Sequence, residues 1–318
     1  FLLFFRSSIV ELARLGKKLP YIQPKKYAEY VFFFKPKYAQ LGFDKEKKNI
    51  LFIVPSIVVG GAEKVVLNIA KTTDSTRYNF YIVTTQPDSN TWLGKFEPYF
   101  HNIFTSLKIN DDPYYYNNTI YKYVQYVVRS FNIDIVIITN SSLAYQYLPL
   151  LKSDFNNVKF IDLLNAENCP AIPQLERVAT YIDKRICVSQ KLKNHLLRRY
   201  KLLNIKEEYT SRLEVIHNGV DTAEFQATPL EKGKFKSRFS IPEKTKIISF
   251  IGRFTSEDKN PLLFIEIAKN VLSKSKSDIK FVMAGNGPEF GILRETIKKD
   301  GLQDQIILTG VLKMSLNS

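Results

Sequence analysis

Short runs of apolar and β-branched residues recur along the chain from residue 49 onward. Apolarity is nearly continuous within each run, which is typical of parallel strands that are buried on both faces. The pattern therefore predicts strands at residues 50–54, 80–85, 133–139, 158–164, 185–188, 213–216, 247–251, 279–284 and 306–308.

Between many of these predicted strands, apolar residues follow the period of an amphipathic helix. They recur at helical spacing within residues 62–70, 120–131 and 262–272. Strands that alternate with helices form βαβ units, so the sequence predicts an α/β fold of doubly wound parallel sheets. A chain of 318 residues has room for two such domains, each with its own core.

One stretch with little periodicity separates the predicted strands into two groups. Residues 225–240 contain Pro229, Gly233 and four basic residues, and we interpret them as the joint between two sheets. The predicted organisation is an N-terminal extension at 1–48, a first domain at 49–230 and the first part of a second domain at 231–318. The second sheet is expected to lack later strands and to expose apolar surface.

The net charge of +15 is concentrated near the start of the chain. Residues 1–48 carry eleven Lys and Arg against four Asp and Glu, and aromatic residues alternate with lysines within 21–38. Such a segment suits an anionic membrane surface. A solvated basic face is the simpler interpretation, and nucleic-acid binding is the weakest because no stacking motif or recognition helix accompanies the charge.

Other global features restrict the class of protein. The only two cysteines, Cys169 and Cys187, have no metal-ligand spacing, which favours a reducing compartment and argues against a disulfide scaffold. The longest apolar run is too short to span a bilayer. The sequence begins without Met and ends directly after a strand-like segment, so we expect a longer chain.

Ligands of open α/β sheets bind beyond the carboxyl ends of the strands, so the loops there are the candidates for function. The first such loop ends in Gly60 and Gly61 and runs into a predicted helix that includes Glu63. Glycines let a backbone approach a ligand closely, and a helix start favours an anion. The loop fits a phosphate or a sugar hydroxyl, although a plain tight turn needs the same residues.

A second loop follows the strand predicted at 247–251 and carries Arg253 and Lys259, with Pro261 suited to a first helical turn. A guanidinium forks onto two phosphate oxygens and an ammonium supplies a mobile point charge, so the pair suits a diphosphate. Two solvated cations beside acidic neighbours remain the alternative.

A third loop, at residues 285–289, contains Gly285 and Gly287 after the strand predicted at 279–284. Residue 290 is Phe, so the loop is not the dinucleotide-binding fingerprint and a dinucleotide-dependent dehydrogenase is disfavoured. A strand-to-helix turn that needs small residues is an equally good explanation.

The order of six short motifs along the chain points to a particular protein family. In chain order they are Gly-Gly-Ala-Glu at 60–63, Val-Ser at 188–189, Asn-Gly-Val-Asp at 218–221, Gly-Arg with a following Lys at 252–259, Gly-Asn-Gly-Pro-Glu at 285–289 and Thr-Gly-Val at 309–311. In sequence and order, these elements resemble the family 4 glycosyltransferases of the GT-B fold, over about residues 49–318. The resemblance implies two Rossmann-like domains and sugar transfer from a nucleotide-sugar donor with retention of configuration.

The resemblance also implies roles for individual residues. Arg253 and Lys259 would hold the donor diphosphate and act in catalysis, with Gly60, Gly61, Gly285 and Gly287 lining the donor site and Val311 and Leu312 near the nucleobase. The acceptor would bind mainly to the first domain, where Glu63 and Asn165 are the candidates. Cations aimed at the leaving group stabilise the charge that develops on it, so we expect neither a metal ion nor another cofactor.

Two departures from the family pattern affect these expectations. The paired glutamates of the family are expected after the last predicted strand, where this sequence ends. Many members place a histidine after the strand corresponding to 158–164, where this sequence has Asn165, a residue that hydrogen-bonds a hydroxyl but carries no proton near pH 7.

The sequence thus predicts a retaining glycosyltransferase that uses a nucleotide-diphosphate sugar and a glycan or lipid-linked acceptor in surface polysaccharide or glycoconjugate synthesis. The residues present here are expected to be inactive by themselves. The alternatives are a sugar epimerase of the same fold, a non-catalytic nucleotide-sugar or glycan binding module, and, last, a nucleic-acid-binding protein. The expected location is the cytoplasm, with peripheral contact to the membrane.

Overall fold

A computed structural model describes residues 37–38, 46–106, 113–167, 177–223, 229–257 and 259–312. Contacts divide the chain into two compact units, Phe1–Val220 and Asp221–Ser318, and each is described by itself. The sequence boundary lies near residue 230, whereas the contacts divide the chain between Val220 and Asp221. Of the N-terminal extension predicted at 1–48, only residues 37–38 and 46–48 are described. Cys169 also lies outside the described residues.

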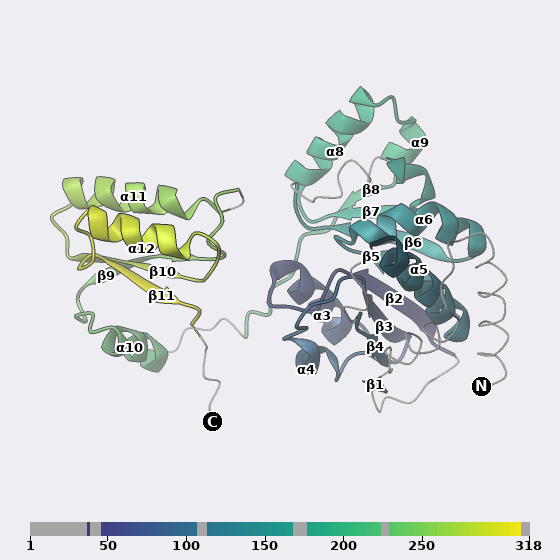
Figure 1. Cartoon of the computed structure of the whole chain (residues 1–318), viewed down its shortest axis with the longest axis horizontal. Helices are drawn as coiled ribbons and strands as arrows, with labels where there is room; N and C mark the ends of the chain where they lie inside the picture. Colours follow the sequence, from purple (N-terminus) through teal and green to yellow (C-terminus); the bar gives the residue numbers. More distant parts are fainter. Residues whose placement is uncertain are drawn as a thin grey trace. The chain divides into compact units, whose positions relative to one another are not determined.

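The first unit is built on one eight-stranded sheet in the order β1-β4-β3-β2-β5-β6-β7-β8 (Figure 1). All neighbouring strands are parallel except β1, which pairs antiparallel with β4 at the edge. The strands are β1 (Lys37–Tyr38), β2 (Lys48–Val54), β3 (Tyr78–Thr84), β4 (Asn102–Phe104), β5 (Ile135–Ile138), β6 (Lys159–Leu164), β7 (Lys184–Cys187) and β8 (Leu213–Val215).

Helices cover both faces of this sheet, as the near-continuous apolar strands predict. Along β2, Leu51 and Ile53 belong to one buried cluster, whereas Phe52 and Val54 belong to another on the opposite face. The helical elements are α3 (Gly61–Thr72), α4 (Leu93–Phe96), α5 (Pro113–Ser130), α6 (Ser142–Asp154), the 3₁₀ turn η2 (Ala179–Tyr181), α8 (Gln190–Leu202) and α9 (Glu207–Thr210).

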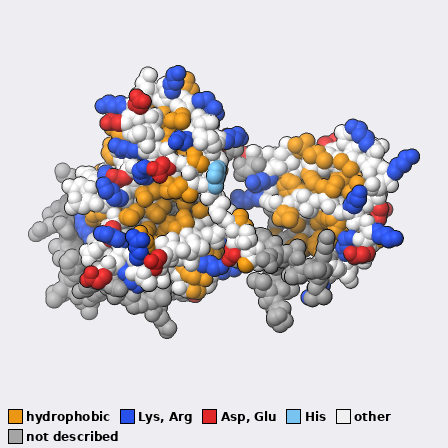
Figure 2. Space-filling view, turned by 180° about the vertical axis from the view of Figure 1, so that it is seen from behind, with side chains coloured by type: hydrophobic (Ala, Val, Ile, Leu, Met, Phe, Trp, Pro, Cys, Tyr) orange, Lys and Arg blue, Asp and Glu red, His pale blue; other side chains and the backbone are white. Residues whose placement is uncertain are grey.

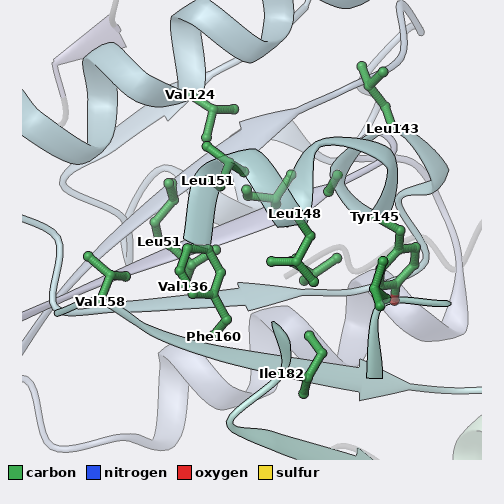
Figure 3. Close-up of a cluster of buried hydrophobic side chains, with 14 of the residues drawn as sticks. Leu51, Val124, Val136, Leu143, Tyr145, Leu148, Leu151, Val158, Phe160 and Ile182 are labelled. Atoms are coloured by element: carbon green, nitrogen blue, oxygen red, sulfur yellow. The ribbon is translucent and has the colours of Figure 1, made fainter. Parts of the chain in front are cut away.

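The larger of the two clusters lies between the sheet and α5 and α6. Figure 3 shows Leu148 and Leu151 of α6 pointing toward Val136 of β5 and Phe160 of β6. These side chains are at most 2% exposed. Burial of each such side chain contributes about 1.5–3 kcal/mol, so this contact holds α6 on the sheet.

The second unit has a three-stranded parallel sheet in the order β11-β10-β9, formed by β9 (Lys246–Ile251), β10 (Ile279–Ala284) and β11 (Ile306–Gly310). Its helices are α10 (Pro229–Arg238), α11 (Pro261–Lys274) and α12 (Phe290–Lys299). The last two pack on the sheet through a cluster that includes Phe254, Ile265, Phe281 and Leu293. The α/β class with two parallel sheets is confirmed.

Two features of the second unit bear on the sequence predictions. The stretch interpreted as the joint between the two sheets contains helix α10, which the weak periodicity of residues 229–238 did not predict. Apolar side chains are exposed, among them Ile251 (81%) and Val311 (67%), and Figure 2 shows hydrophobic side chains across one face of this unit.

One ion pair is buried within the first unit. Arg185 of β7 donates from Nε to Oδ2 of Asp162 on β6 at 2.6 Å, and the two side chains are 2% and 0% exposed. Tyr145 of α6 donates to the same carboxylate at 2.6 Å, and Arg185 also donates to the hydroxyl of Tyr200 on α8. Removal from water raises the pKa of Asp162, and Arg185 and Tyr145 act against that rise. The network joins two strands to two helices.

Cys187 lies beside this network and is buried. Burial raises the pKa of its thiol to about 11, so the thiol stays protonated at neutral pH. Among the described residues, no helix has the length and apolarity needed to cross a membrane.

Replacing Asp162 leaves the Arg185 guanidinium buried without its partner. We expect Asp162→Asn to lower the free energy of unfolding by about 3–5 kcal/mol, measured by urea denaturation. The matched control is Glu214→Gln, which removes an exposed ion pair with Lys184 and costs less than about 1 kcal/mol. Equal losses in the two variants would contradict a structural role for the buried pair.

Candidate functional site

The loops at the carboxyl edge of the first sheet follow strands that meet where the strand order reverses. The chain runs outward from β2 through β3 to β4 on one side, and from β5 through β6 to β8 on the other. Ligands of open α/β sheets bind at such a reversal point. A ligand of the first unit is therefore expected at the loops after β2 and β5.

The predicted residues Gly60, Gly61 and Glu63 lie where the loop after β2 meets α3: Gly60 is the N-cap of the helix, and Gly61 and Glu63 are in its first turn. An added Cβ at Gly60 would lie 2.1 Å from Oε2 of Glu63, whereas one at Gly61 would meet nothing within 4 Å. The backbone of Gly60 is extended, with φ of −162°, so any residue could adopt its conformation. The short contact at position 60 involves only the flexible end of the Glu63 side chain, which can move aside, so neither contact nor backbone conformation requires a glycine there.

Polar side chains gather at the ends of β3, β5 and β6. Thr85 and Ser141 are hydrogen-bonded through their hydroxyls at 2.8 Å, and Asn165 donates from Nδ2 to Oγ1 of Thr139 at 2.9 Å. We call Thr85, Thr139, Asn140, Ser141 and Asn165 the polar edge. Ser141 also caps α6, since its hydroxyl accepts a bond from the amide of Ala144.

Two acceptor atoms of the polar edge have no partner in the part of the chain that the structure describes. They are the buried Oδ1 atoms of Asn140 and Asn165. Asn140 has φ of 55°, in the left-handed region. Buried acceptors without a donor are rare, and sugar hydroxyls are donors of the right kind. The sequence reasoning found Asn165 but missed Asn140, whose signal is the polar run Thr-Asn-Ser-Ser directly after β5.

In the second unit, Arg253 and Lys259 lie at the two ends of one turn in the loop after β9. The amides of Lys259 and Asn260 both donate to the carbonyl of Thr255, at 3.1 and 3.0 Å, which closes a turn. An added Cβ at Gly252 would lie 3.9 Å from Cγ of Lys259, so the lysine stem returns to the residue before Arg253.

Both cations of this turn are exposed. Neither has a hydrogen-bond or ion-pair partner within the described ranges; Asp258 lies outside them. The turn leads into α11, which Asn260 caps in a left-handed conformation and which begins at Pro261, as the sequence predicts. The turn therefore presents two cations at the carboxyl edge of β9, beside a helix start.

The third loop, after β10, packs directly on the second. Gly285 has φ of +150°, and an added Cβ would lie 1.8 Å from the carbonyl oxygen of Gly252. At Gly287 it would lie 2.4 Å from the carbonyl oxygen of Phe254. Contact within the chain thus requires both glycines, which favours the interpretation as a turn that needs small residues. Val311 is exposed and Leu312 half-buried directly after β11.

Two family models match the chain. The family described as Glycosyltransferase Family 4 matches residues 59–224, and the one described as Glycosyl transferases group 1 matches residues 231–316. The first match covers more than half of the 318 residues. The chain belongs to glycosyltransferase family 4.

Two curated proteins are similar to shorter segments of this chain. A 2-deoxystreptamine glucosyltransferase of Streptomyces kanamyceticus is 28% identical over 101 residues, which are 31% of this chain and 26% of the relative. An alpha-monoglucosyldiacylglycerol synthase of Streptococcus pneumoniae is 28% identical over 137 residues, 42% of this chain and 29% of the relative. The chain matches less than a third of the length of either relative.

Solved structures share the fold over most of the chain. Anabaena HepE, in complex with UDP, has a TM-score of 0.62 at 16% identity, covering 83% of this chain and 69% of that one. A glycosyltransferase from Rickettsia africae has the same TM-score at 22% identity, covering 84% and 69%. These likenesses establish a GT-B-like fold for the family 4 chain.

The close contacts of Gly285 and Gly287 lead to a prediction about stability. Gly285→Ala and Gly287→Ala should each lower the free energy of unfolding by about 3 kcal/mol or more, because a methyl group there overlaps backbone atoms. Thermal unfolding measures the loss. The control is Gly291→Ala on α12, where an added Cβ meets nothing within 4 Å and should stabilise by about 0.5–1 kcal/mol. Stable Gly285→Ala protein would refute the contact-based explanation.

Proposed function

We propose that the chain is part of a retaining glycosyltransferase that moves a sugar from a nucleotide-diphosphate sugar to a hydroxyl of a glycan or lipid-linked acceptor, in surface polysaccharide or glycoconjugate synthesis. The observation that carries this proposal is the turn with Arg253 and Lys259, exposed cations at the end of a parallel strand in a family 4 chain. Related structures were solved in complex with UDP and with UDP-glucose, which supports such a donor.

The chemistry of the proposed transfer explains why two cations belong there. As the bond between sugar and diphosphate breaks, negative charge grows on the leaving diphosphate. Arg253 offers a fork of donors and Lys259 a mobile charge, and such preorganised groups lower the barrier by a few kcal/mol each. In this proposal the two side chains stabilise the leaving group without a metal ion, and donor binding persists in EDTA.

The remaining assignments follow the same proposal. The exposed residue Val311 and its neighbour Leu312 contact the nucleobase, and the turn of Gly285 and Gly287 lines the donor site. The acceptor binds to the first unit, where the free Oδ1 atoms of the polar edge accept bonds from sugar hydroxyls beside Asn165. Gly60, Gly61 and Glu63 form the adjoining loop on that unit.

Donor binding tests the proposal most directly. Calorimetric titration with UDP, GDP and ADP is expected to show binding of one nucleotide, weakened at least about tenfold, or 1.4 kcal/mol, in the variant Arg253→Ala with Lys259→Ala. The control removes two exposed cations of α12, Arg294→Ala with Lys298→Ala, and should bind as the unmodified chain does. If no nucleotide binds to folded protein, the donor site is wrongly placed.

A non-catalytic binding module on the same fold is the second candidate. Asn165 favours it, because its amide is committed to Thr139 and cannot relay a proton. Nucleotide-sugar binding without release of nucleoside diphosphate, in a chain completed to the length of its relatives, would favour this candidate. Turnover under the same conditions would exclude it.

We also propose that the protein works in the cytoplasm in peripheral contact with an anionic membrane. The basic aromatic segment at 1–48 that suggested this lies largely outside the described residues. Helix α8 gives separate support: it carries Lys191, Lys193, Arg198, Arg199 and Lys201 and no acidic residue. At its end Leu202 and Leu203 are 80% and 51% exposed, and Figure 2 shows basic and hydrophobic side chains, with a few acidic ones, at the top of the first unit, where Figure 1 places α8.

Vesicle flotation tests this contact. Binding to phosphatidylserine-containing vesicles, and not to vesicles of phosphatidylcholine alone, is expected to fall in Leu202→Ser with Leu203→Ser and on deletion of residues 1–48. Leu263→Ser replaces an exposed leucine of α11 in the other unit and serves as the control. Flotation that neither change reduces would contradict the proposal.

A further inference from the structure

Glu289 joins the loop after β10 to the loop after β9, which carries Arg253 and Lys259. It is the last residue before α12, and its Oε1 accepts a hydrogen bond from the amide of Ser256 in the neighbouring loop. Its own amide donates to the carbonyl of Phe254 at 3.3 Å. One residue therefore holds the backbone on both sides of Thr255.

The segment held in this way determines where the two cations lie. Phe254 follows Arg253, is fully buried, and donates from its amide to the carbonyl of Asn286 at 3.0 Å. The carbonyl of Thr255 closes the turn that returns Lys259. The backbone path from one cation to the other thus passes through the residues that Glu289 fixes.

A carboxylate is an unexpected neighbour for a site that attracts anions. Its negative charge lowers the positive potential of the turn, which opposes binding of a diphosphate. Its Oε2 is buried and has no hydrogen-bond partner among residues 229–257 and 259–312. Charge therefore does not explain a glutamate at this position, whereas the geometry of its bond to Ser256 does.

We propose that Glu289 is a positioning residue, which fixes the turn between Arg253 and Lys259 so that both cations face one diphosphate. The contact with Ser256 is independent of ligand, but the consequence for the diphosphate rests on the proposed donor site. The hydrogen-bond acceptor is what matters, so an amide in place of the carboxylate keeps the function. Misplacing a binding group by about 1 Å is enough to cost large factors in activity.

The first experiment measures the contact without any ligand. In the full chain, amide hydrogen exchange at Ser256 is expected to be at least about tenfold faster in Glu289→Ala and close to the unmodified rate in Glu289→Gln. Glu295→Ala removes an exposed carboxylate from the same helix and is the matched control. Because Ser256 is exposed, water replaces the lost bond and the second unit stays folded, which thermal unfolding verifies. Unchanged exchange in Glu289→Ala would overturn the proposal.

The second experiment measures the consequence with UDP, GDP and ADP as probes. Binding of the preferred nucleotide is expected to weaken about tenfold in Glu289→Ala, about 1.4 kcal/mol, and to be kept or strengthened in Glu289→Gln, where the opposing charge is absent. Equal weakening in both variants would assign the effect to charge and overturn the positioning role. Lack of binding to the unmodified chain, with altered exchange in Glu289→Ala, would instead refute the donor site and leave the contact established.

Discussion

Parallel pairing of strands that are buried on both faces is the constraint on which the rest of the structure depends. Parallel strands need a crossover between them, and here helices supply the crossovers and cover both faces, as Leu51 and Phe52 on opposite sides of β2 show. Because parallel strands end at the same edge of a sheet, the loops after β2, β5 and β6 gather there in one unit and those after β9 and β10 in the other. The candidate site residues therefore follow strand ends, either in a loop or, like Gly61 and Glu63, in the first turn of the next helix.

Much of this architecture was predictable from the sequence, because burial on both faces leaves nearly unbroken apolar runs. The same reasoning failed at α10, which carries Lys232, Lys234, Lys236 and Arg238 and few apolar residues, so that no helical stripe marks it. A helix of ten residues with a weak apolar face depends on its tertiary contacts more than on its own pattern. The division of the chain at Val220 is likewise a property of contacts that no local pattern records.

For the candidate site, the sequence predicted which loops carry it but not which contacts within the chain explain the glycines in those loops. Gly60 suggested close approach to a ligand, and Gly285 and Gly287 suggested either a lining of the donor site or a turn that needs small residues. The atoms nearest to these three positions belong to Glu63, Gly252 and Phe254. At Gly285 and Gly287 the approaching backbone comes from residues 33 positions earlier in the chain, so no local pattern reveals the contact. The contact of Glu289 with Ser256 escaped prediction for the same reason: 33 positions separate its two residues.

Arg185 within β7 and Arg253 after β9 show how surroundings decide the role of one residue type. Arg185 is 2% exposed and bound to Asp162 and Tyr200, so its charge is already compensated and its contribution is to the stability of the first unit. Arg253 is exposed, and no described residue neutralises it. An exposed guanidinium of this kind can form two charge-assisted hydrogen bonds with a diphosphate. The availability of these cations, more than any single motif, is what favours a nucleotide-sugar site.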